Sequence, residues 1–392
     1  MTVDISVDKV FEEDGLFTKI TYMRVGSDKK FPVLPSINLA QGVKSVTLKN
    51  LKTTVIVENY IKLELSELRR MNEDGERQKR FIRDEIKISE ENPSFIVIKL
   101  LIKNNDQIND NDIKYLCALL MHPHNTLVIP PLVYYYKLSN KSRVSIQNPL
   151  ELDKYIKFTS NFLKRLTENY KVTETALTIP TNISNDKIKA LTDEYKGIKT
   201  QIAFIDLHGG TAMDIYTQLN SMIKTPSKKE ELYNLEQKNG ENYLLYGFDS
   251  KPYGSPKDIA PAKNVLQYTY GISAFGPRYT LPKMKFPKGP RKPYMPRVYY
   301  EEEYAFVKPH YADYKKIAKG VEDWTSTAFP DVKDAPTNRT YMLNYNTNMI
   351  INSAKEIYQN AEEKNLGKFL GKKKAIEKYV SQIKRFNHKF NV

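Results

Sequence analysis

Apolar and polar residues alternate in blocks along residues 126–275. Short apolar runs rich in β-branched and aromatic residues recur at 126–136, 175–180, 200–207, 242–248 and 268–275. Between these runs, apolar residues follow the three- and four-residue steps of a helix face at 151–166, 185–195 and 211–223. Strands and helices that alternate in this way predict parallel βαβ units.

Two earlier apolar runs, at 53–63 and 94–102, raise the number of expected strands to about eight, which is the number that closes a parallel barrel. We therefore expect an α/β fold, and within that class a (β/α)8 TIM-like barrel. An open doubly wound sheet is the alternative architecture.

The chain divides into three parts by composition. Residues 1–275 are expected to form the barrel. Residues 276–300 contain six prolines and are expected to form a basic loop without a helix or a central strand. Residues 301–392 are expected to complete the barrel with helices at 341–365 and 367–386 and to end in a basic tail.

The chain is strongly basic, because its 392 residues include 61 Lys+Arg against 46 Asp+Glu, a formal net charge of +15. This balance excludes an acidic surface and favours a polyanionic partner.

A single cysteine, Cys117, excludes an internal disulfide and a Cys-based zinc site and favours a reducing, cytoplasmic location. Residues 1–19 lack an apolar leader and no run of eighteen apolar residues occurs, so we expect no secretion signal and no membrane span. Of the five histidines, only His122 and His124 have ligand spacing, and a polar turn explains that pair, so we expect no metal and no cofactor.

Active sites of parallel barrels lie at the carboxyl ends of the strands, which directs attention to the end of the run at 200–207. There, Asp206 and His208 lie two residues apart, and two glycines follow before the next expected helix. Such a turn either lets a ligand approach the backbone and the helix N-terminus, or is an ordinary tight βα turn. Asp206 and Asp249, at the end of the next run, are either functional carboxylates or structural ones paired with a neighbouring lysine.

Residues 276–297 contain seven basic residues and no acidic one, with aromatic residues between them. Cations neutralise phosphates and aromatic rings stack on unpaired bases, so this composition predicts a nucleic-acid contact; a solvated loop is the alternative. The expected contact residues are Arg278, Tyr279, Lys283, Lys285, Phe286, Lys288, Arg291, Lys292 and Arg297. Residues 364–389 add nine basic residues, for which a solvated helix face is the simpler explanation.

Five segments resemble, in order along the chain, the motifs of one superfamily. They are PVLPSINL at 32–39, VIVENYI at 55–61, LHGGTAMDI at 207–215, LYG at 245–247 and NYNT at 344–347. The corresponding motifs are P-x-L-L-P-V-I-N-P, L-I-T-N-S-Y-I, the base-recognition turn V-Q-G-G/S-x-x-x-D-L, L-F-G, and L-H-N-L before a helix. From about residue 16 to 370 the chain resembles the tRNA-guanine transglycosylase superfamily, especially its archaeal branch and related phage enzymes acting on DNA.

The resemblance implies a barrel enzyme that exchanges a guanine for a 7-deazaguanine through a covalent nucleic-acid intermediate. It also implies a base pocket, matched to Thr178, His208, Gly209, Gly210 and Gly247.

The sequence departs from the family at its catalytic positions. The general acid/base aspartate matches Leu132, and the nucleophilic aspartate matches Gly271, which has no side chain to attack a glycosidic carbon. The base-reading aspartate matches Thr178, and the recognition glutamine matches His208. The zinc-binding cysteines are missing, and Tyr345 occupies the place of their histidine partner.

Three hypotheses follow. In the first, the chain is a transglycosylase-like protein that binds tRNA or DNA, lacks base exchange, and pairs with an active homologous subunit or a second copy of itself. In the second, it is an active base-exchange enzyme, of the pentosyltransferase class, whose relocated carboxylates are Asp206 and Asp249. In the third, it is a structural or interaction protein that reuses the barrel.

The first two hypotheses share a geometric expectation. The four residues matched to family positions should cluster at one rim of the barrel, because all four are expected at the carboxyl ends of strands. They are Leu132, Thr178, His208 and Gly271.

Overall fold

The structure is a computed structural model of the chain. It describes residues 3–13, 16–25, 29–32, 36–38, 56–86, 93–103, 106–123, 125–138, 145–180, 183–195, 197–200, 202–215, 244–250, 259–277, 297–307 and 339–390.

Two sheets of parallel strands form the centre of the molecule. The first has the order β4 (Ser36–Asn38), β5 (Ile56–Glu64), β6 (Ser94–Ile102), β7 (Leu132–Leu138) and β8 (Ser145–Pro149), and only β8 runs antiparallel to its neighbour. The second has the order β13 (Ile272–Pro277), β11 (Leu244–Ser250), β10 (Ile202–Asp206) and β9 (Leu177–Ile179), all parallel. The predicted α/β class is therefore confirmed, and β9, β10 and β11 are parallel neighbours as expected.

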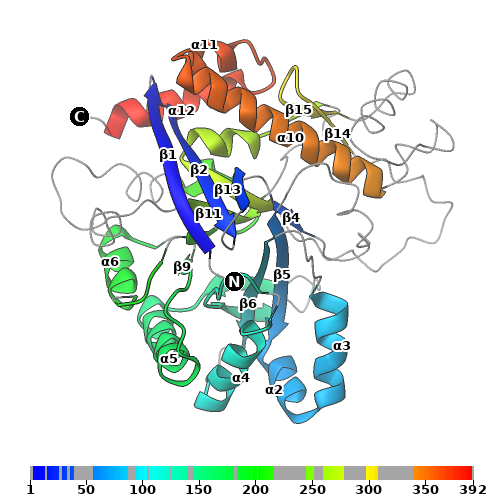
Figure 1. Ribbon diagram of the computed structural model, residues 1–392, viewed down its shortest axis with the longest axis vertical. Coiled ribbons are helices and arrows are strands. Elements are labelled where there is room, and N and C mark those ends of the chain that lie inside the picture. Colours follow the sequence, from blue (N-terminus) through cyan, green and yellow to red (C-terminus); the bar gives the residue numbers. More distant parts are fainter. Residues whose placement is uncertain are drawn as a thin grey trace.

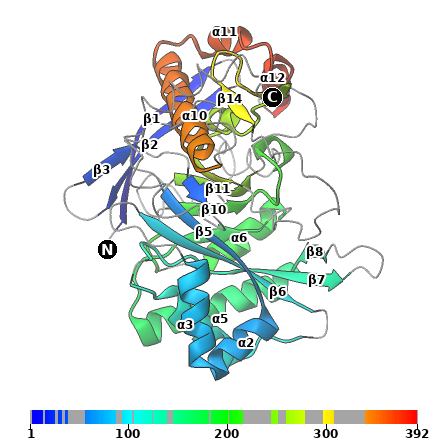
Figure 2. The same ribbon diagram turned by 90° about the vertical axis from the view of Figure 1, so that its right-hand side faces the viewer.

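The two sheets contact each other in two places. The segment that leads into β7 lies beside β9, because the amide of Ala176 donates to Val128 O (3.0 Å) and the hydroxyl of Thr178 donates to Pro130 O (2.9 Å). At the other edge, β13 contacts β4. Figures 1 and 2 show the two sheets side by side in the middle of the molecule.

Amphipathic helices cover one side of these sheets. They are α2 (Leu65–Glu73), α3 (Gly75–Glu85), α4 (Asp110–Leu120), α5 (Leu152–Tyr170) and α6 (Asn185–Asp193), and they surround the lower part of the molecule in Figure 1. A capping box of Asn109 and Asp112 begins α4, so two amides of its first turn are satisfied. Along α5, Tyr155, Phe162 and Leu166 are buried at helical spacing, which explains why this segment packs as a helix.

An antiparallel sheet at the N-terminus was not predicted. It consists of β1 (Val3–Glu13), β2 (Leu16–Val25) and β3 (Lys29–Pro32). The signal was present, because Val3, Ile5 and Val7 alternate with polar residues at the period of a strand. At the end of β1, the Glu13 carboxylate accepts hydrogen bonds from the amides of Leu366 (2.8 Å) and Gly367 (3.0 Å), which ties this sheet to the C-terminal helices.

The C-terminal part packs a small sheet against helices at the opposite end from α2–α6. The sheet has the order β12 (Ile259–Pro261), β15 (Ala305–Val307), β14 (Val298–Tyr300), and the helices are α10 (Arg339–Glu362), α11 (Leu366–Gly371) and α12 (Glu377–Phe390). The side-chain amide of Asn346 on α10 accepts from the Tyr299 amide (2.8 Å) and donates to Arg297 O (2.9 Å). Hydrogen bonds and packing thus dock α10 on β14.

Two predicted elements have different bounds. The helix expected at 367–386 is two helices, α11 and α12, separated by residues 372–376. The strand expected at 268–275 begins later, because residues 265–269 form a 3-10 helix and Gly271, at φ 78°, turns the chain into β13. Among the described residues, the helices are all too short or too polar to cross a membrane.

Candidate functional site

A buried ion pair lies at the centre of the candidate site. The ammonium group of Lys99, from the middle of β6, lies 3.1 Å from Asp206 Oδ2 at the carboxyl end of β10, and the two side chains are 1% and 0% exposed. The Tyr134 hydroxyl from β7 donates to the same carboxylate oxygen, and the His208 amide donates to the other oxygen at 2.7 Å. Both oxygens of Asp206 are therefore engaged within the protein, as a buried carboxylate requires.

His208 is the exposed member of this network, with 43% of its side chain accessible. Its ring stacks on Tyr134 at a centroid distance of 5.7 Å and an interplanar angle of 3°. Its Nδ1 lies 3.1 Å from Lys99 Nζ, and because an ammonium only donates, Nδ1 must accept. The neutral ring then carries its proton on Nε2, on the side of the ring away from Lys99.

The backbone at the ends of β10 and β11 is held in an uncommon conformation. His208 and Asp249 have positive φ angles of 47° and 56°, which non-glycine residues seldom adopt. A hydrogen bond from the Gly209 amide to Asp249 O (2.8 Å) joins the two strand ends. Left-handed residues of this kind concentrate at functional sites, where the surrounding structure holds them in place.

Asp249 completes a group of three side chains that sequence reasoning had named separately. One carboxylate oxygen of Asp206, one ring nitrogen of His208 and one carboxylate oxygen of Asp249 lie within 4.8 Å of one another. Two carboxylates and an imidazole would suit a divalent cation. However, the Lys99 ammonium already lies 3.1 Å from both Asp206 Oδ2 and His208 Nδ1, so a fixed cation occupies the position that a metal would need.

Glu58 on β5 is a second buried carboxyl group close to this site. Its Oε2 accepts a hydrogen bond from the Tyr246 hydroxyl at 2.6 Å, and its Oε1 has no hydrogen-bond partner among the described residues. Burial raises the pKa of Glu58 to about 8; the hydrogen bond from Tyr246 opposes the rise, and the negative charge of Asp249 adds to it. Glu58 is therefore a neutral carboxylic acid near pH 7.

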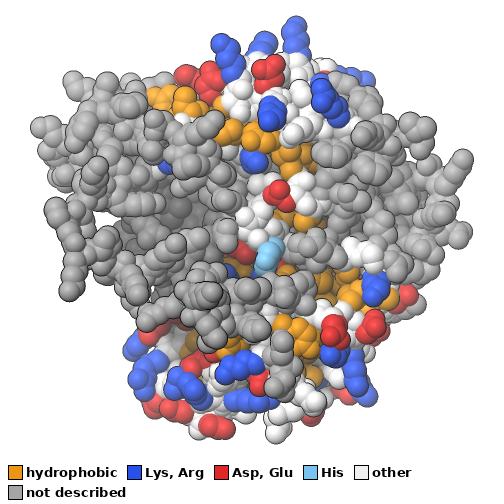
Figure 3. Space-filling view, turned by 180° about the vertical axis from the view of Figure 1, so that it is seen from behind, with side chains coloured by type: hydrophobic (Ala, Val, Ile, Leu, Met, Phe, Trp, Pro, Cys, Tyr) orange, Lys and Arg blue, Asp and Glu red, His pale blue; other side chains and the backbone are white. Residues whose placement is uncertain are grey.

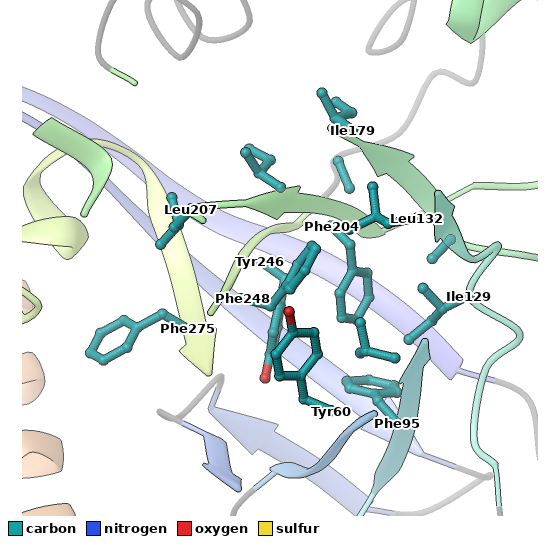
Figure 4. Close-up of a cluster of buried hydrophobic side chains, with 14 of the residues drawn as sticks. Tyr60, Phe95, Ile129, Leu132, Ile179, Phe204, Leu207, Tyr246, Phe248 and Phe275 are labelled. Atoms are coloured by element: carbon teal, nitrogen blue, oxygen red, sulfur yellow. The ribbon is translucent and has the colours of Figure 1, made fainter. Parts of the chain in front are cut away.

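The rings around Glu58 form the apolar floor beneath the site. Phe204 and Tyr246 stack at 4.5 Å, and Phe95 meets both edge-on at 5.4 and 6.0 Å. Figure 4 shows these rings, with Tyr60 and Phe248, converging from strands of both sheets. These rings are all buried, and the low dielectric constant of a buried environment strengthens the electrostatic interactions of the charged groups beside them.

The glycine turn after β10 is satisfied internally. The Gly210 amide donates to Leu207 O (2.7 Å), and the amide and hydroxyl of Thr211 donate to Asp214 Oδ2. With the Gly209 amide bonded to Asp249, the amides expected to face an anion are already engaged. This finding favours the tight βα turn over an anion site.

Two further residues of the expected base pocket have structural contacts instead. Thr178 is fully buried and donates its hydroxyl to Pro130 O. A side chain at Gly247 would collide with Leu207, since the added Cβ would lie 2.8 Å from Leu207 Cδ1. Of the expected pocket, His208 alone among the described side chains offers an exposed polar group.

The expected clustering of the family-matched residues at one rim is wrong. Leu132 is the first residue of β7 and is fully buried, and Gly271 precedes β13, level with the beginning of β11. His208, in contrast, follows the last residue of β10. The physical reason is that both runs begin with irregular or 3-10 segments, so the strands begin later than their apolar residues suggest. The carboxylates at the strand ends are instead Asp206 and Asp249.

Most of the expected nucleic-acid contacts lie outside the described residues, since these do not include 278–296. Arg297 is described, and its guanidinium donates to Phe306 O at 3.2 Å, a structural contact within the small sheet. Figure 3 shows that the described Lys and Arg side chains of the face in view gather at its two ends.

Sequence reasoning missed Lys99, Tyr134 and Glu58. Each stands inside an apolar run that becomes a buried strand, and a charged residue in such a run is costly unless it is paired. This rule could have singled out Lys99 and Glu58 from the sequence.

The comparisons with known proteins add no family. No protein-family model matches the sequence, and no curated protein matches it.

Proposed function

We propose that the chain is a transglycosylase-like barrel protein that binds a nucleic acid, receives one of its bases at His208, and does not exchange that base by the family's chemistry. The proposal places the protein in the cytoplasm. It also allows three states of assembly: a monomer, a homodimer, or a complex with an active homologous subunit.

The barrel itself is part of the proposal. The parallel strands β4–β7 and β9, β10, β11 and β13 follow one another in chain order. The segment before β7 lies beside β9, and β13 contacts β4. A ring of eight parallel strands is the arrangement that this order favours.

The observation that carries the proposal is the state of Asp206. This carboxylate is 0% exposed, and both of its oxygens are engaged by Lys99, Tyr134 and the His208 amide, so it is poorly placed to attack a sugar or to remove a proton. What the network supports instead is a histidine whose ring rests on Tyr134 and whose Nε2–H points away from the ion pair. A fixed donor on a flat, exposed ring suits recognition of a base edge or a base plane.

Anisotropy titrations of labelled single-stranded DNA, duplex DNA and tRNA against NaCl test the binding. Changing Arg278, Lys288, Arg291 and Lys292 together to Ala should flatten the slope of log affinity against log salt by roughly three to four units. His208→Ala should weaken binding about threefold to tenfold and leave the slope unchanged, because it removes one neutral hydrogen bond. His122→Ala is the matched control. Salt-independent affinities, or equal losses in the two histidine variants, would overturn the proposal.

Base exchange through relocated carboxylates is the second candidate. The observation in its favour is the position of Asp249. Its backbone has a positive φ angle, and one of its carboxylate oxygens lies within 4.8 Å of a carboxylate oxygen of Asp206 and a ring nitrogen of His208. Incorporation of labelled guanine into tRNA or DNA that disappears in Asp249→Asn would establish this candidate over pure binding.

A further inference from the structure

The described polar groups near Glu58 leave its charge uncompensated. Tyr246 and Asp249 face it from β11 and Tyr60 from its own strand, and Tyr60 in turn lies near Asp206 of β10 and Tyr134 of β7. β13 contributes Gly276, whose backbone lies so close that an added Cβ would overlap the Glu58 carboxyl group. Among the described residues of this group the cation is Lys99 on β6, and Asp206 already binds it.

One hydrogen bond to Glu58 bears on the position of its proton. With Oε2 accepting from the Tyr246 hydroxyl at 2.6 Å, the neutral acid carries its proton on Oε1. That oxygen is buried without a partner among the described residues. A buried O–H group that donates to nothing is unfavourable, and a ligand atom that accepts from it would relieve the cost.

We propose that Glu58 is the inner hydrogen-bond donor of the base site, and that it selects a neutral heterocycle with an acceptor, a carbonyl oxygen or an unprotonated ring nitrogen, at its buried edge. This inference rests on the proposed function, and it adds a ligand-selecting residue to it. His208 supplies a donor where the site is exposed, and Glu58 supplies one where it is buried.

A dependence of binding on pH follows from this role. Above about pH 8 Glu58 ionises, loses the donor proton and places a second negative charge beside Asp249. Affinity should then fall about tenfold per pH unit, because binding requires the protonated form. In Glu58→Gln the side-chain amide keeps both a donor and an acceptor and does not titrate, so affinity should remain within about threefold of wild type at pH 6.5 and stay constant to pH 9.5.

The experiment uses an oligonucleotide of adenines and cytosines, whose bases do not titrate between pH 6.5 and 9.5. Its affinity for wild type, Glu58→Gln and Glu58→Ala is measured at constant ionic strength. Glu64→Gln, on the exposed end of the same strand, is the control and should keep the wild-type pH dependence. Carboxyl ¹³C shifts of glutamate-labelled protein provide a readout without ligand: one glutamate should titrate near pH 8, and its signal should be missing in Glu58→Gln.

The outcomes separate this inference from the proposed function. Binding that falls above pH 8 in wild type and stays constant in Glu58→Gln supports the inference. Three results would overturn the inference and leave the proposed function standing. They are wild-type affinity that does not fall above pH 8, the same fall of affinity in Glu58→Gln, and the absence of a glutamate that titrates near pH 8. If wild type binds no nucleic acid at any pH, the proposed function fails, and the inference fails with it.

Discussion

Removing either member of the Lys99–Asp206 pair should destabilise the protein far more than removing both. At 3.1 Å and an effective dielectric constant near 20, the attraction between the two charges is about 5 kcal/mol. Lys99→Met leaves the Asp206 carboxylate buried without its cation, and Asp206→Asn leaves the Lys99 ammonium without its anion. Each single variant should therefore lose about 3–5 kcal/mol of unfolding free energy.

The double variant Lys99→Met/Asp206→Asn removes both buried charges, so its loss should be much smaller than the sum of the single losses, with an interaction energy of about 3 kcal/mol. Urea unfolding at pH 7, followed by far-UV circular dichroism, measures all three. The surface pair of Lys79 and Glu76 is the control: its atoms are 2.8 Å apart but its side chains are 76% and 70% exposed, and Lys79→Met should cost under about 1 kcal/mol. Single losses under about 1 kcal/mol, or losses that add within about 0.5 kcal/mol, would refute a dry ion pair at this position.

Three more changes test neighbouring contacts. The pKa of Glu58 in the folded protein, about 8, lies above its ordinary value of 4.5, so the wild-type protein should lose stability as the pH rises from 4.5 to 8, by at most about 5 kcal/mol. Urea titrations at a series of pH values should find this loss in wild type and not in Glu58→Gln. Gly276→Ala should lower the melting temperature because its Cβ would overlap the Glu58 carboxyl group, whereas Gly75→Ala, with open space around it, should not. Asn346→Ala should cost about 1–3 kcal/mol by breaking two hydrogen bonds to the backbone at β14, and Asn111→Ala, on an exposed face, should cost under about 0.5 kcal/mol in the same urea assay.

Periodicity alone predicted most of the central strands. The run at 94–102 became β6 with the same bounds, since all nine of its residues are buried between sheet neighbours and covering helices. The predicted strand boundaries were wrong where the local backbone geometry departs from a strand although the residues are apolar. Tyr268 is buried and reads as a strand residue, yet it belongs to a 3-10 helix, and Gly271 sets the turn before β13.

The site was less predictable because its contacts join distant parts of the chain. Asp206 and His208 were visible at a strand end, but the lysine that pairs with them lies 107 residues before Asp206. A single charged residue in an apolar run predicts that it has a partner, but it does not identify that partner. The same applies to Glu58 and Tyr246, which are 188 residues apart.

On the proposed function, the charges of the site would determine which part of a nucleic acid enters it. Glu58, Asp206 and Asp249 bring three carboxyl groups to this site, where Lys99 pairs with Asp206 and burial keeps Glu58 neutral near pH 7. A phosphate at this position would meet the carboxylates in a buried environment and be repelled. A neutral base would not, and it could accept hydrogen bonds from Glu58 and His208. The phosphates of the proposed ligand would then be neutralised by basic residues elsewhere, for which 276–297 and 364–389 are the candidates in the sequence.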